Sequence, residues 1–180
     1  MQLTFCSSRP ALIVLLFFES FLFGKAYANE TLCEKSEAIH FSCLVANSKK
    51  VISVCGSPAL SEDEGYLQYR FGRPGAVELV YPKTKEKTQQ QFYWEENNNY
   101  QSGSKTLYFE IGSYSYAVFS FEIGEVLSGK SDGEKKYGVW VGRLGVNAPP
   151  YETLCASVPD GVFNLGSVVT GPAPGSGVKK

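Results

Sequence analysis

The sequence predicts an all-β protein, a single antiparallel β-sandwich or small barrel of about eight strands with two disulfides. Apolar residues alternate with a period of two through most of the chain, and no window after residue 28 keeps the 3.6-residue period of a helix. Clusters of Gly, Pro, Asn and Ser separate these alternating stretches. Four cysteines remain beyond the N-terminal region, and an even number is typical of disulfide-bonded exported proteins.

Residues 1–28 are predicted to be a signal peptide. Arg9 supplies a positive start, "ALIVLLFF" begins an apolar run, and "AYA" before Asn29 matches a cleavage site. Glu19 interrupts the run, which leaves it shorter than the roughly 20 residues of a spanning helix. Removing the segment also removes Cys6 and leaves a net charge of about −2. We therefore expect a periplasmic or secreted protein with no membrane span after cleavage and no nucleic-acid partner.

The remaining chain divides into a secreted β domain, residues 29–160, and a flexible C-terminal tail, residues 161–180. The tail is predicted because "GSVVTGPAPGSGVKK" is rich in Gly and Pro and lacks aromatic residues. The expected strands are 38–45, 50–55, 65–71, 76–82, 91–96, 105–111, 115–121 and 137–143.

The clearest element is a hairpin that turns at Gly112-Ser113, since glycine as the first central residue suits a two-residue turn. This turn places apolar residues opposite one another in the pairs Ile111–Tyr114, Phe109–Tyr116 and Leu107–Val118. The other face carries Tyr108, Phe119 and Phe121. Two interpretations stay open: a neighbouring segment covers this face, or it is an exposed aromatic patch that binds a ligand or partner.

A second hairpin, centred on Pro74, directs Gln68, Arg70 and Glu78 to one side, where we expect a solvated face.

The expected disulfides join Cys33, Cys43, Cys55 and Cys155. A turn at Ser48-Lys49 would place Cys43 opposite Val54 and direct Cys55 to the other face, so Cys43 and Cys55 cannot bond. Two connectivities remain. The preferred one is Cys33–Cys43 with Cys55–Cys155, and the alternative is Cys33–Cys55 with Cys43–Cys155.

Few residues offer catalytic chemistry. His40 is the only histidine, is expected on the outward side of its strand, and has no free cysteine or zinc-site spacing around it. No nucleophile elbow or phosphate-binding loop is present in the sequence. We therefore expect no cofactor, no metal and no enzyme activity. An envelope hydrolase that uses strand carboxylates such as Glu78 and Glu110 is the alternative.

Several phrases, "VISVCGS", "GYLQYRFG", "ELVYP" and "GSYSYAVFS", together with Cys43, resemble a group of small exported bacterial four-cysteine proteins of unknown function. The resemblance covers residues 33–155 and implies export and a β fold. The chain is also similar, more loosely, to periplasmic lysozyme inhibitors, several of which insert a Ser-Gly-x-x-Tyr loop into the lysozyme cleft. Ser102 and Gly103 fit that pattern, but Tyr108 comes two residues late.

The functional hypothesis is a non-enzymatic, monomeric binding protein of the cell envelope, with a lysozyme inhibitor as one version. Its partner would be an envelope protein or glycan. A purely structural interaction protein is a further alternative. The candidate binding residues are Tyr100, Ser102, Gly103, Ser104, Tyr108, Phe119 and Phe121.

Overall fold

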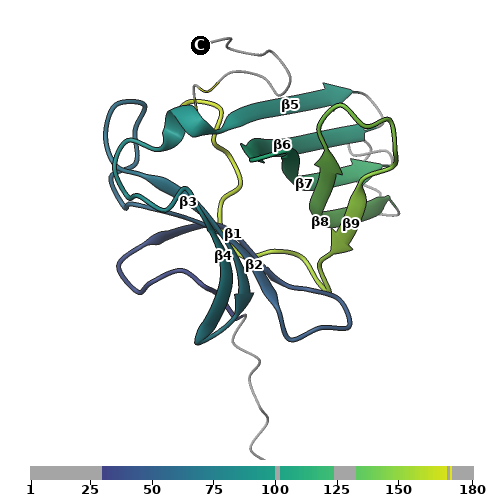
Figure 1. Cartoon of the computed structure of the whole chain (residues 1–180), viewed down its shortest axis with the longest axis horizontal. Helices are drawn as coiled ribbons and strands as arrows, with labels where there is room; N and C mark the ends of the chain where they lie inside the picture. The colour runs from purple at the N-terminus through teal and green to yellow at the C-terminus, as the bar shows by residue number, and fades with distance from the viewer. Residues whose placement is uncertain (1–29, 100–101, 124–132, 170, 172–180) are drawn as a thin grey trace, which may run out of the picture.

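Two antiparallel sheets make up the computed structural model, which describes residues 30–99, 102–123, 133–169 and 171 (Figure 1). The first sheet contains, in order, β1 (Ala38–Leu44), β2 (Val51–Gly56), β3 (Leu67–Arg73) and β4 (Ala76–Tyr81). The second contains β5 (Tyr93–Asn99), β6 (Ser102–Ile111), β7 (Tyr114–Ile123), β8 (Glu134–Arg143) and β9 (Tyr151–Leu154). A short 3₁₀ helix, η1 (Gln89–Gln91), precedes β5. The predicted all-β fold is confirmed, and β9 is a strand that the sequence analysis missed.

The β6–β7 hairpin has the predicted register. Ile111 lies opposite Tyr114, and the pairing continues without a shift to Ser102 and Ile123. Gly112 has a φ of 60°, which a glycine adopts without steric cost. The turn residue and the apolar alternation agree, so this hairpin fixes the register of the second sheet.

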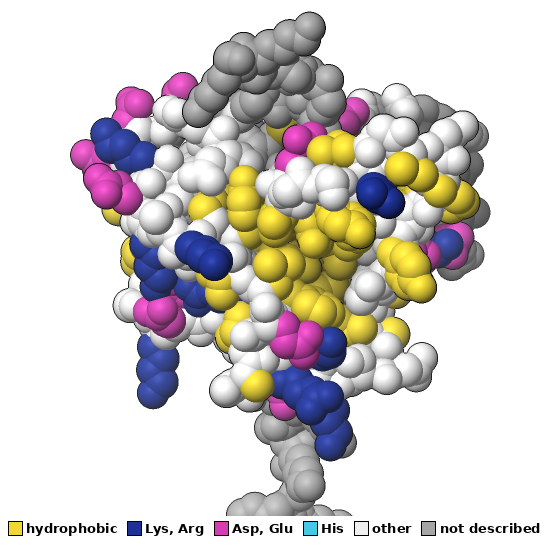
Figure 2. All heavy atoms as spheres, in the orientation of Figure 1, with side chains coloured by type: hydrophobic (Ala, Val, Ile, Leu, Met, Phe, Trp, Pro, Cys, Tyr) yellow, Lys and Arg dark blue, Asp and Glu magenta, His cyan; other side chains and the backbone are white. Residues whose placement is uncertain are grey.

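The core lies between the sheets and contains the apolar side of each. Leu107, Val118 and Val139 stand side by side on β6, β7 and β8, and all three are buried. Aromatic rings connect the sheets: Phe109 stacks on Tyr81 of β4 and on Tyr116 of β7, with 5.0 Å between ring centroids in both pairs. Figure 2 shows hydrophobic side chains gathered in a hollow between the two sheets on one face of the molecule.

The chain after β9 is part of the packed domain. It crosses from the end of β9 to the region of η1 (Figure 1), and on the way Asp160 pairs with Ser42 of β1. Leu165 is fully buried and Val169 nearly so, both within the core. The predicted boundary at residue 160 thus falls inside a packed segment. Of the predicted flexible tail, residues 170 and 172–180 lie outside the described residues. The whole predicted signal peptide, residues 1–28, lies outside them too.

The disulfides are Cys33–Cys55 and Cys43–Cys155, so the preferred pairing was wrong and the alternative is the one present. Cys43 lies opposite Ile52, not Val54, but this shift of two residues keeps Cys43 and Cys55 on opposite faces as predicted. The pairing follows instead from the N-terminal segment, which brings Cys33 over the outer face of the sheet, where Cys55 points. The inference that Cys43 and Cys55 cannot bond is confirmed. Because Cys43–Cys155 closes a separation of 112 residues, it stabilises the fold by about 5 kcal/mol in the chain-entropy account.

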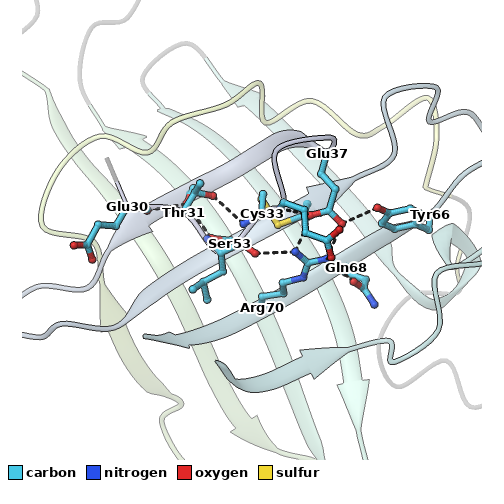
Figure 3. Close-up of a disulfide and its surroundings, with 12 residues drawn as sticks. Glu30, Thr31, Cys33, Glu37, Ser53, Tyr66, Gln68 and Arg70 are labelled. Atoms are coloured by element: carbon cyan, nitrogen blue, oxygen red, sulfur yellow. Dashed lines mark hydrogen bonds and ion pairs between the residues drawn. A yellow bond between two sulfur atoms is a disulfide. The ribbon is translucent and has the colours of Figure 1, made fainter. Parts of the chain in front are cut away.

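The outer face of the first sheet is covered by the N-terminal segment 30–37, and Figure 3 shows the contacts beneath it. Arg70 donates two hydrogen bonds to the carboxylate of Glu37, at 2.7 and 2.6 Å, and both side chains are buried. Gln68 accepts a hydrogen bond from Arg70 and is buried too. The expectation of a solvated face was therefore wrong for Gln68 and Arg70, while Glu78 is exposed.

Within the described part of the chain, no helix is long and apolar enough to cross a membrane. The two disulfides are typical of a protein that folds in an oxidising compartment outside the cytosol.

Candidate ligand-binding site

A cavity of about 470 Å³ lies between the second sheet and the C-terminal segment. This volume falls within the usual range of small-molecule sites. The lining comes from the end of β5, the start of β6, the end of β7, the first half of β8, Phe41 of β1 and the segment 158–163.

The floor of the cavity comes from neighbouring strands. Lys105 lies opposite Ser120, and Ser120 opposite Tyr137, so the three form one row across β6, β7 and β8. Gly103 and Glu122 form the next row. Because strand side chains alternate between faces, these rows continue the inner face that carries the core. The inner face is therefore apolar in the middle of the sheet and polar at this end.

The opposite wall is the segment from Val158 to Gly161, together with Phe163. Two backbone hydrogen bonds hold this segment to β1: Ser42 N–H donates to the Asp160 carbonyl at 2.9 Å, and Asp160 N–H donates to the Ser42 carbonyl at 2.8 Å. Phe163 packs edge-on against Phe41, with 5.0 Å between centroids. The ring of Phe163, the apolar Val158 and Pro159, and the acidic Asp160 thus face the polar floor across the cavity.

The two charged floor residues have partners of opposite sign. Lys105 Nζ lies 4.0 Å from a carboxylate oxygen of Glu96, and Glu122 lies 3.2 Å from Lys135 Nζ. Burial raises the pKa of Tyr137, and the nearby carboxylate of Glu122 raises it further. The phenol hydroxyl therefore stays protonated at neutral pH and can donate one hydrogen bond and accept another.

The predicted binding residues separate into two groups. Ser102, Gly103 and Ser104 line the cavity, but they belong to β6 and not to a loop. Tyr108 and Phe121 are partly buried on the outer face of the same sheet.

Phe119 is also on that outer face, but it is only 1% exposed and stacks on Trp140, so it is a packing residue. Tyr100 lies outside the described residues. The aromatic face thus mixes buried with accessible rings, and neither of the two open interpretations holds for all of it.

Sequence reasoning missed Lys105, Ser120, Tyr137 and Phe163. The first two could have been found, because the predicted hairpin register already places Lys105 opposite Ser120 on the apolar face, where polar residues are unexpected. Phe163 could not, because its contact with β1 depends on a segment without strand periodicity.

The carboxylates of the hydrolase alternative do not form a pair. Glu78 is on β4 of the first sheet, where it accepts a hydrogen bond from Lys50 Nζ at 2.7 Å. Glu110 is on β6 of the second sheet. By strand alternation both point away from the core, on opposite sheets, so they cannot flank one scissile bond.

His40 is partly buried at the β1 bulge, and its Nε2 atom is buried with no hydrogen-bond partner among the described residues. Burial lowers the pKa of His40, against the opposing effect of a hydrogen bond with the Val162 backbone. The histidine is therefore neutral at physiological pH and not a surface residue.

Cys33, Cys55 and Glu37 lie close enough together to suggest a metal site. Both sulfur atoms belong to one disulfide, so no thiolate is present to bind a metal, and the Glu37 carboxylate is engaged by Arg70. This cluster is a structural one.

Comparison of the chain with protein-family models, with curated proteins and with solved structures found no match. The cavity therefore has to be interpreted from its own residues.

Proposed function

We propose that the chain is an exported, non-enzymatic binding protein of the cell envelope, with its ligand in the cavity between the second sheet and the C-terminal segment. The signal peptide, the periplasmic or secreted location and the monomeric state belong to this proposal. The observation that carries it is a cavity of ligand size with an aromatic and apolar wall facing a row of polar side chains.

The lining favours a neutral, polyhydroxylated ligand such as the end of an envelope glycan. Lys105 and Glu122 each have a partner of opposite charge, so the floor presents hydrogen-bonding groups with little net charge. Asn98 and Asn99 add amides, Ser120 a hydroxyl, and Phe163 an apolar ring. Sugars combine hydroxyl groups with apolar C–H faces, which this combination of donors, acceptors and rings can bind.

The sharpest test fills the cavity without straining the fold. A Cβ atom added to Gly103 would meet nothing closer than Asn98 Oδ1 at 3.5 Å, an ordinary contact. Gly103→Val therefore places two methyl groups on the cavity floor. The matched control is Gly142→Val, on the outer face of the same sheet, where an added Cβ has its nearest neighbour at 3.9 Å.

The probe is the β-1,4-linked disaccharide of N-acetylglucosamine, and the measurement is isothermal titration calorimetry. We expect the natural chain and Gly142→Val to bind it equally, and Gly103→Val to bind at least tenfold more weakly. Equal binding by all three proteins would place the ligand elsewhere, and no binding by the natural chain would reject the glycan proposal.

A protein partner of the lysozyme kind is the second candidate. It is favoured by the exposed Asn98 and Asn99 at the end of β5, next to the predicted Ser102-Gly103 motif. This version predicts that an excess of the protein inhibits a lysozyme and that Gly103→Val reduces the inhibition. A lysozyme rate that excess protein leaves unchanged rejects it.

A further inference from the structure

The outer face of the second sheet carries a row of aromatic side chains that the cavity does not use. Tyr93, Tyr108, Ala117, Trp140 and Glu152 lie opposite one another on five successive strands, from β5 to β9. Ala117 in the middle is small and only 6% exposed, so the neighbouring side chains close over it. All three aromatic residues are partly exposed.

Trp140 is held with one ring face covered. It stacks on Phe119, with 3.9 Å between ring centroids and 15° between the planes. Phe119 lies opposite Gly138, on one side of Trp140 along β8, so the other indole face is directed toward Gly142 on the far side. Gly142 lies opposite Ser115, and the nearest atom to an added Cβ at Gly142 is Pro150 Cβ at 3.9 Å, so the space over Gly142 is open apart from that proline.

Carboxylate groups lie next to two of the aromatic rings in this row. Trp140 Nε1 donates a hydrogen bond to Glu152 Oε1 at 2.8 Å, which fixes an exposed carboxylate at the edge of the indole. Glu95 interacts with the hydroxyl of Tyr108 and, after burial, contributes to its raised pKa. The cation Lys136 on this face has its own counterion, since its Nζ lies 3.0 Å from Glu134. The aromatic row is therefore negatively charged.

A ring face beside a carboxylate attracts a positive charge in two ways, through the quadrupole of the ring and through the opposite charge. We propose that this row binds a guanidinium or ammonium side chain of a positively charged partner polypeptide, seated over Gly142 against the indole of Trp140 and beside the carboxylate of Glu152. A polypeptide fits because β9 is the last strand of its sheet and Tyr151 at its start is 84% exposed, so an extended segment can lie along residues 151–153; beyond them Ala46 N–H already donates to the Leu154 carbonyl.

This surface is independent of the proposed glycan site. Ser120 and Tyr137 of the cavity floor and Ala117 and Trp140 of the aromatic row lie on opposite faces of the same strands. Loss of one activity therefore leaves the other in place.

The test uses two peptides that differ only in charge, acetyl-Gly-Gly-Arg-Gly-Gly-amide and the same peptide with neutral citrulline in place of arginine. The readout is the indole N–H signal of Trp140 in a ¹H–¹⁵N NMR spectrum of the full domain with its disulfides intact. Trp94, whose ring packs against Phe163 inside the molecule, is the internal reference.

We expect the arginine peptide to shift the Trp140 signal saturably and the citrulline peptide to bind about tenfold more weakly. Gly142→Val should abolish the shift by filling the space over the ring, while Gly103→Val should preserve it. Glu152→Gln keeps an oxygen that accepts from the indole but removes the charge, and should weaken binding severalfold.

Three results would overturn the proposal. The first is an equal shift of Trp140 by both peptides, and the second is no shift at the highest soluble concentration. The third is a shift by tetramethylammonium at lower concentration than by the arginine peptide, which would assign the site to a small cation.

Discussion

The outer faces of the two sheets differ although their strands alternate in the same way. On the first sheet, Ser53, Gln68 and Arg70 are buried, because residues 30–37 lie over them and a disulfide and an ion pair tie this cover down. On the second sheet, Tyr108 and Trp140 stay accessible. Polar residues thus mark the closed face and aromatic residues the open one, the reverse of what hydrophobicity alone predicts. The chain itself closes the outer face of the first sheet and leaves rings on the outer face of the second accessible.

The disulfides should give the largest effects. Replacing Cys43 and Cys155 by alanine should lower the free energy of unfolding by about 5 kcal/mol, and replacing Cys33 and Cys55 by about 3 kcal/mol, because the second bridge closes a separation of only 22 residues. Urea denaturation measures both.

Hydrogen exchange would then locate the change. Loss of Cys33–Cys55 should expose amides of the first sheet and leave β6 and β7 protected. Increased exchange spread evenly over both sheets would contradict the separate roles of the two outer faces.

Arg70→Ala should cost about 3 to 5 kcal/mol, because it removes the buried cation that bonds both carboxylate oxygens of Glu37 and leaves only the more exposed Lys85, 3.1 Å away. The matched control is Lys50→Ala, which removes the exposed ion pair with Glu78 and should cost less than about 1 kcal/mol. The comparison of urea midpoints is decisive. Similar small losses for both variants would mean that the cover of the first sheet is solvated in solution.

The same carboxylate makes stability depend on pH. Burial alone would raise the pKa of Glu37, but hydrogen bonds from Arg70, Tyr66, the Glu34 backbone and Lys85 outweigh it and lower the pKa to about 2. Since the folded-state pKa lies below the unfolded value, the stabilisation is fully present above about pH 4.5 and is lost as the pH falls toward 2.

Glu37→Gln should remove this dependence, whereas Glu152→Gln on the open face should keep it and change stability by less than about 0.5 kcal/mol. Urea midpoints between pH 2 and 7 test both. A natural-chain midpoint that stays constant from pH 5 to 2 would show that Glu37 is not held as an ion.

The alternation of apolar residues along the chain was sufficient to predict β1 to β8 and the register of the β6–β7 hairpin. Eight alternating stretches became β1 to β8, and the turn at Gly112-Ser113 fixed the β6–β7 pairing because glycine and apolar alternation agree there. The register of β1 failed because the turn is centred one residue earlier than predicted, at Asn47-Ser48, where Asn47 has a positive φ. The disulfide preference failed for a separate reason: no local signal places Cys33 over the outer face of the first sheet.

Only part of the candidate site could be predicted from the sequence. Ser102, Gly103 and Ser104 were found from a loop pattern, but the opposite wall depends on the pairing of Asp160 with Ser42, which no local signal indicates. The buried pair of Glu37 and Arg70 was missed for the same reason. Contacts between segments far apart in the chain determine which polar residues are exposed to solvent.

The C-terminal segment sets an order of events during folding. Leu165, which completes the core, and Val158 to Gly161, which close the cavity, all come from the last quarter of the chain. Contacts between distant segments form late and slowly. If the chain is exported as proposed, it could pair its first sheet early, yet it could neither seal its core nor form the cavity until translocation is almost complete. We therefore expect chains that stop before residue 155 to be exported but to be removed by proteases.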